Sequence, residues 1–145
     1  MLKKNTFILI STLIIIISGF VIYSNSLDCS FHLDDYNNIV YNNDIKDISN
    51  TEAWWNYSAN RPVSMSSFVL NYHFNKLDVK YYHLVNIIIH IINALLIFWL
   101  MRLIFYSPVI SKYKVLNQKR LLALFISILF LTHPLATQSV TYIIQ

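Results

Sequence analysis

The sequence predicts an all-α membrane protein with about three transmembrane helices and one large outward loop. Two features support this prediction. Of the 145 residues, 56% are hydrophobic and only 12% are charged, and the apolar residues gather in three long runs. This balance excludes a disordered chain. The net charge of +4 is not concentrated in a contiguous basic arm, so nucleic acid is not an expected partner.

Glycine and cysteine are too rare for several kinds of site. The single glycine excludes the glycine-rich loops that bind dinucleotides and nucleotide phosphates, because those loops need several glycines for close backbone approach. The single cysteine, Cys29, excludes an internal disulfide and a cysteine-based zinc cage.

Residues 7–23 form the first expected membrane helix. They follow a short N-terminal segment, residues 1–6, that carries Lys3 and Lys4. Because no small-residue cleavage site comes after the apolar run, we expect an uncleaved anchor.

Residues 81–106 form the second expected membrane helix. Its stretch Leu84–Tyr106 is almost wholly apolar, and 23 residues at about 1.5 Å each give about 35 Å of helix. That length spans the hydrocarbon layer with some tilt.

Residues 121–145 form the third expected helix, which is interrupted. Its apolar run lasts twelve residues, about 18 Å, which is too short to cross a membrane alone. His133 and Pro134 then break the run before a weaker apolar stretch resumes. Because proline lacks a backbone donor, we expect a kink at this pair.

The charges predict how the helices are oriented. Cytoplasmic flanks are enriched in Lys and Arg, which places residues 1–6 and the basic loop 107–120 inside. The 57-residue loop 24–80 then faces outward, to the periplasm or the lumen. It holds every acidic residue of the chain: Asp28, Asp34, Asp35, Asp44, Asp47, Glu52 and Asp78.

Two adjacent carboxylates, Asp34 and Asp35, stand near the start of the outward loop. Each raises the proton affinity of the other, so such a pair can supply a general base. A solvated acidic turn is the alternative.

Further along, Arg61 precedes a rigid proline and could bind a phosphate through two hydrogen bonds. Pairing with a loop carboxylate is the alternative for this arginine.

The second helix carries a polar stripe of His83, Asn86, His90 and Asn93 at steps of 3, 4 and 3. This spacing puts all four on one side of the helix, and we expect that side to face protein or a wet cavity rather than lipid. Hydrogen bonding between helices is the simplest role for the two asparagines. The two histidines lie two turns apart, too far to hold one metal ion, so no metal site is expected. For His133, a satisfied histidine and a functional one both stay open.

The order of these motifs resembles one family of membrane enzymes. The stretches are FHLDDYNNIV, then RP, then NYHFNKLDVKYYHLVNIIIHIINALL, then THPLATQSVTYIIQ. Together they resemble the N-terminal part of the transmembrane and tetratricopeptide-repeat proteins. These are polytopic glycosyltransferases of the GT-C fold, a group that includes protein O-mannosyltransferases. The resemblance covers Phe31–Gln145.

This resemblance implies an activity and a set of site residues. Relatives of this kind transfer a sugar, often mannose, from a polyprenyl-phosphate donor to a hydroxyl acceptor, which can belong to a protein. The resemblance implies that Asp34 is the base for the acceptor hydroxyl, with Asp35 beside it. It also implies that Arg61, His90 and His133 contact substrate. It leaves open whether a divalent cation takes part.

The resemblance also implies an incomplete enzyme and a location. Such enzymes have many more helices than this chain, so we expect an N-terminal fragment that is inactive alone. Its partners would be the lipid bilayer, the lipid-linked sugar and the acceptor. Its place would be the plasma (inner) membrane of a bacterium or the endoplasmic reticulum membrane of a eukaryote.

Two other kinds of function were weighed against this one. A non-catalytic three-helix membrane protein, whose outward loop binds a partner, is the alternative from another class. Ion or proton transport along the polar stripe ranks last, because the expected helices hold no acidic residue that could relay a proton.

Overall fold

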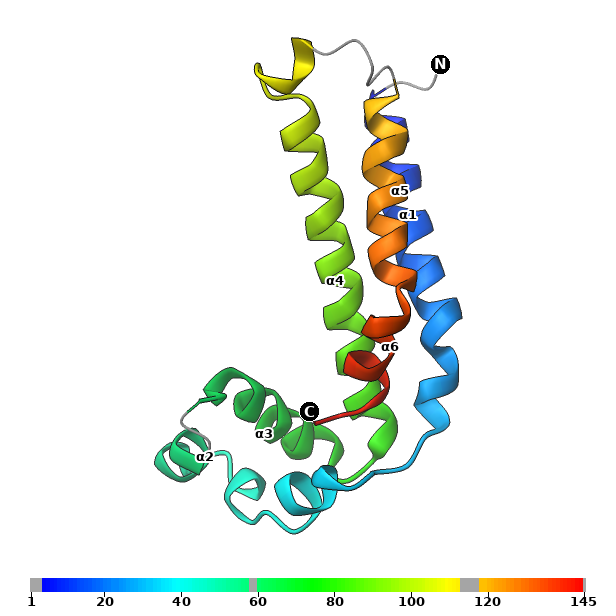
Figure 1. Ribbon diagram of the computed structural model, residues 1–145. Helices are drawn as coiled ribbons and strands as arrows, with labels where there is room; N and C mark the ends of the chain where they lie inside the picture. The colour runs from blue at the N-terminus through cyan, green and yellow to red at the C-terminus, as the bar shows by residue number, and fades with distance from the viewer. Residues whose placement is uncertain (1–3, 58–59, 113–117, 145) are drawn as a thin grey trace. The chain divides into compact units, whose positions relative to one another are not determined.

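The chain folds into helices joined by turns (Figure 1). The computed structural model describes residues 4–57, 60–112 and 118–144. No strand occurs in these ranges, which confirms the predicted all-α class. The α-helices are α1 (Lys4–Tyr23), α2 (Thr51–Tyr57), α3 (Pro62–Asn75), α4 (Val79–Phe105), α5 (Lys119–Thr132) and α6 (Pro134–Thr141), and the short turns are η1 (Ser24–Asp28), η2 (Tyr36–Val40), η3 (Asp44–Lys46) and η4 (Ile110–Lys112).

Two of these helices have the length and composition of membrane spans. One candidate span is Asn5–Asp28, which includes α1, and the other is α4. The pair α5 and α6 makes a third if it is taken as one span, bent by 56° at its break. The chain is therefore a membrane protein with two to three candidate spans. The predicted kink is confirmed, because α5 ends before His133 and α6 begins at Pro134.

Parts of the predicted segments lie outside the described residues. These are positions 1–3 of the N-terminal segment, 58–59 of the outward loop, 113–117 of the basic loop and 145 of the third helix, with Lys3 and Lys114 among them.

The segment 24–80, expected as one polar loop, is largely helical. It contains α2, α3 and three shorter turns. Pro62 starts α3 because its fixed φ suits the first helical position. Met65, Phe68 and Val69 recur at helical spacing and are buried. The serines between these apolar residues hide that periodicity in the sequence.

The described chain divides into two compact units. Unit 1 consists of Met1–Ser24 and Ile87–Val140, and unit 2 consists of Asn25–Asn86 and Thr141–Gln145. In unit 1, α5 packs against α1 (Figure 1). The Ser127 hydroxyl of α5 also donates to the Ala94 carbonyl of α4 over 2.6 Å. Helix α5 thus contacts both α1 and α4 within unit 1.

One backbone carbonyl joins α1, α4 and α5 within unit 1. The proline break deprives the end of α5 of its usual amide donors. The Leu131 carbonyl instead accepts the Tyr23 hydroxyl of α1 at 2.9 Å and lies 3.1 Å from Nε2 of His90 on α4. Since a carbonyl can only accept, Nε2 of this histidine carries the proton.

The only glycine of the chain lies where α1 meets α4. A Cβ built on Gly19 would lie 2.8 Å from Cδ1 of Ile91 and closer still to its Cγ1. Small residues allow close approach of this kind between membrane helices.

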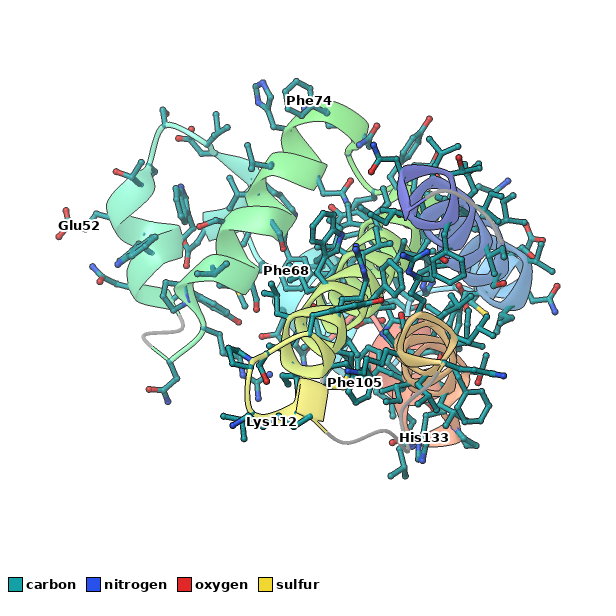
Figure 2. The ribbon with its side chains drawn as sticks, turned by 90° about the horizontal axis from the view of Figure 1, so that it is seen from above. Glu52, Phe68, Phe74, Phe105, Lys112 and His133 are labelled. Atoms are coloured by element: carbon teal, nitrogen blue, oxygen red, sulfur yellow. The ribbon has the colours of Figure 1, made fainter. Side chains whose placement is uncertain are left out.

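Unit 2 has an apolar core of its own. Its members come from the turns η2 and η3, from α3, from the first turns of α4 and from the end of the chain: Ile39, Ile45, Met65, Phe68, Val69, Tyr82 and Ile143. The Tyr82 hydroxyl donates to the Lys76 carbonyl at 2.8 Å, which fixes the short link between α3 and α4. Phe68 is buried, whereas Phe74 and Glu52 point away from the rest of this unit (Figure 2).

We expect Gly19→Leu to lower the free energy of unfolding by about 1–3 kcal/mol, because the added side chain must displace Ile91 in a packed interface. The control is Val21→Leu on the same helix, where the native side chain is 68% exposed, and its effect should stay within about 0.5 kcal/mol. Circular dichroism of the purified chain in detergent measures both during thermal unfolding. Equal melting behaviour of the two variants would contradict the close packing of α1 on α4.

Candidate functional site

The two adjacent aspartates of unit 2 have opposite environments. Asp35 is only 2% exposed. Its Oδ2 accepts the backbone N–H of His32 at 2.9 Å, and its Oδ1 accepts the backbone N–H of Ile144 at 3.0 Å. Its own N–H donates to the His32 carbonyl at 2.8 Å, so this pair bonds reciprocally and closes the turn before η2. Asp35 therefore holds the turn against a segment 109 positions away.

Asp34 presents its carboxylate to solvent. The Asn38 side chain donates to its backbone carbonyl at 2.7 Å, which fixes the main chain and leaves the carboxylate oxygens uninvolved. The residue before it, Leu33, is 83% exposed and has φ 39°. That conformation is costly for a residue with a Cβ, and such strain tends to collect at functional sites.

A pocket of about 240 Å³ opens beside this turn within unit 2. It is lined by Cys29, His32, Leu33, Thr141 and Tyr142. The rings of His32 and Tyr142 lie 6.3 Å apart and are tilted to each other.

The far side of this pocket comes from the segment after α6. Tyr142 is anchored through its carbonyl, which accepts the Asn86 side chain at 3.0 Å. Two parts of the chain distant in sequence thus meet at the pocket, held together by Asn86 and Asp35.

His83 lies near the Asp35 carboxylate, which holds the turn to the segment that contains Ile144. It is 1% exposed, and neither of its ring nitrogens has a hydrogen-bond partner within residues 4–57, 60–112 and 118–144. The Asp35 carboxylate and the Cys29 backbone lie close to the ring. No group of three or more His, Cys, Asp or Glu residues in the described ranges is arranged to hold a metal ion.

Arg61 also belongs to unit 2. It is exposed and directly precedes α3, where its carbonyl accepts the Met65 N–H at 3.1 Å. Arg61 and the aspartates thus come from different elements of one unit. A role for Arg61 in binding phosphate stays a prediction.

The other two predicted site residues belong to unit 1. His90 is 6% exposed, with its ring bonded to the Leu131 carbonyl and stacked edge-on to Tyr23 at 5.3 Å. His133 is exposed, and its Nδ1 accepts the Leu135 N–H at 3.3 Å, which caps the start of α6. Both therefore have structural contacts, and their expected contact with substrate stays a prediction.

The polar stripe of α4 faces protein over most of its length. His83 and His90 are buried, and Asn86 is half-buried and bonded to Tyr142. Asn93 is the exception, because it is exposed. Whether it faces a wet cavity or other helices, as expected for the stripe, stays a prediction.

The sequence analysis did not identify the residues that line the pocket. His32 and Leu33 belong to the motif FHLDDYNNIV, which also contains the two aspartates. This motif was therefore the sequence signal for them. Tyr142 and Thr141 gave no local signal, because their place beside the turn depends on a contact between distant segments. The different exposure of Asp34 and Asp35 was also unpredictable, since adjacent identical residues look the same in a sequence.

Comparison with known proteins shows that the chain is distantly similar to a protein O-mannosyl-transferase. The chain is 28% identical to protein O-mannosyl-transferase TMTC3 of Homo sapiens over 135 residues, which cover 84% of this chain. It is 27% identical to the protein of the same name from Mus musculus over 135 residues. In both cases the chain spans only 13% of the relative's length. No family model matches the chain, and no solved structure matches it.

We expect Asp35→Asn to lower the free energy of unfolding by about 1.5–3 kcal/mol, because hydrogen bonds to a charged acceptor are lost and an amide NH₂ must face a backbone N–H. Asp34→Asn has the same chemistry at an exposed position, so its effect should stay within about 0.5 kcal/mol. Denaturant unfolding in detergent, followed by circular dichroism, measures both. Equal losses in the two variants would show that Asp35 is not a structural clamp.

Proposed function

We propose that this chain contributes the outward face and first membrane helices of a glycosyltransferase that moves a sugar, mannose-like, from polyprenyl phosphate to a hydroxyl acceptor. One observation carries the proposal. A solvent-exposed carboxylate, Asp34, stands on a clamped turn beside a pocket, in a membrane chain distantly similar to a protein O-mannosyl-transferase.

The proposed orientation puts this turn outside the membrane. Four described basic residues gather at the other end of α4 and α5: Arg102, Lys112, Lys119 and Arg120. By the positive-inside rule that end is cytoplasmic, so Asp34 faces the periplasm or the lumen. The membrane would be the inner membrane of a bacterium or the endoplasmic reticulum membrane of a eukaryote.

The proposed reaction assigns Asp34 one step. The acceptor hydroxyl oxygen bonds to the anomeric carbon of the sugar as the bond from that carbon to the phosphate oxygen breaks. Polyprenyl phosphate leaves with the electron pair, and Asp34 takes the hydroxyl proton. An exposed carboxylate suits this task because an acceptor can reach it, whereas both oxygens of Asp35 are already bonded to backbone N–H groups.

Asp35 and Arg61 have separate tasks in this proposal. Asp35 is a positioning residue, since it sets the place of Asp34 through the backbone of the turn. Arg61, if it contacts the donor, would bind the phosphate and stabilise the negative charge that develops on it. A mannosyl donor and a protein acceptor are the specific substrates that the similarity suggests.

We expect Asp34→Asn to lower kcat for sugar transfer by at least about 100-fold, because general base catalysis contributes about 10²–10⁴-fold. The assay uses the full-length protein that contains this chain, in membranes supplied with polyprenyl-phosphate mannose and a panel of hydroxyl acceptors. Asp44→Asn is the matched control, since it removes an exposed carboxylate from the same unit without touching the turn. Transfer at the parental rate by Asp34→Asn would refute the assignment of the base.

A further inference from the structure

A second pocket lies in unit 1, at the end of α4 where the helix stops at Phe105. Its volume is about 450 Å³, and it is lined by Trp99, Arg102, Leu103, Tyr106 and Arg120. Four of these residues belong to the last turns of α4 and the position just after it, and Arg120 is the second residue of α5. Figure 2 looks onto this end of the unit, with Phe105 and Lys112 near the viewer.

Part of the Arg102 guanidinium is buried without a hydrogen-bond partner among the described residues. Its Nε and Nη1 are buried without a hydrogen-bond acceptor among the residues that the structure describes. The guanidinium lies over the rings of Phe98 at 5.5 Å and Trp99 at 5.4 Å. These rings fix its plane and attract its charge, but they supply no lone pair to its N–H groups.

Unit 1 has no carboxylate side chain that could accept hydrogen bonds from Arg102. The sequence of Met1–Ser24 and Ile87–Val140 contains no Asp and no Glu. Arg120, on the other side of the pocket, donates from Nε to the Tyr106 hydroxyl at 3.3 Å and adds a second guanidinium. Arginine does not lose its proton in proteins, so two positively charged side chains line this pocket.

The surroundings of the pocket identify the kind of anion. Trp99, Leu103 and Tyr106 are each more than half exposed at the end of a membrane-spanning helix. Aromatic rings of this kind lie at the headgroup level of a bilayer, and a leucine beside them contacts acyl chains. A phosphate between the two guanidiniums would pair with their charge, and the acyl chains attached to it would cover the apolar wall of the pocket.

We propose that this pocket binds the phosphate group of an anionic phospholipid in the leaflet at the Phe105 end of α4. Arg102 and Arg120, which line the pocket from α4 and α5, are its two cationic ligands. The bound lipid supplies an anion beside the two guanidiniums, and it stabilises the contact between the ends of the two helices. A soluble phosphate monoester shares this chemistry, and the experiment separates the two sources.

Native mass spectrometry of the purified chain, titrated with dioleoyl phosphatidylglycerol, tests the site directly. We expect Arg102→Gln and Arg120→Gln each to weaken binding by at least about fivefold, because each removes a charged hydrogen-bond donor from the phosphate. The matched control is Lys112→Gln, which removes one exposed charge from the same end of the unit but does not line the pocket. It should change binding by less than about twofold.

The source of the phosphate is tested with the unmodified chain. Dioleoyl phosphatidylcholine, whose headgroup has no net charge, should bind at least about fivefold more weakly, and glycerol phosphate without acyl chains should not compete at the same concentration. Equal binding of the two lipids, equal losses in all three variants, or full competition by glycerol phosphate would each overturn the proposal. If Arg102→Gln loses helix content by circular dichroism, Arg102→Lys and Arg120→Gln replace it in the comparison.

Discussion

The carboxylate of Asp35 is the constraint on which the candidate site depends. Its two oxygens bind two backbone N–H groups, one from the turn that carries Asp34 and one from the segment after α6. A buried carboxylate is stable only when such partners are present, so the residue enforces the meeting of two distant segments. The pocket beside Asp34 exists because of this contact, and the Asn86 side chain supports it from α4.

Unit 1 also depends on one buried acceptor, but there the acceptor belongs to the backbone and its donors are side chains. There the proline break leaves a backbone acceptor, the Leu131 carbonyl, and side chains from two other helices turn toward it. In a bilayer such a group has no water to bind, so the helices must satisfy it themselves. The kink is therefore tolerated because Tyr23 and His90 lie where they do. At the end of α4 the described residues offer no such partner to two nitrogens of Arg102, and we propose that an external anion binds beside this residue.

The sequence predicted well the features that depend on neighbouring residues. The runs that became α1 and α4 and the break at Pro134 are local patterns of hydropathy and backbone chemistry. The helix α3 was missed because serines interrupt its apolar face. The separate roles of Asp34 and Asp35 could not be predicted, because burial of the second depends on Ile144, 109 positions away. The distant similarity to a protein O-mannosyl-transferase supports the proposed function, which residue patterns alone did not indicate.

Hydrogen exchange at the Ile144 amide tests the central claim most directly, because that N–H donates to the Asp35 carboxylate. In the intact chain in lipid nanodiscs, mass spectrometry with residue-level fragmentation should show exchange at least about tenfold slower than in an unstructured peptide. In Asp35→Ala that protection should disappear, whereas in Asp34→Ala it should persist. Exchange at the unstructured rate in the intact chain, or equal protection in both variants, would contradict the clamp.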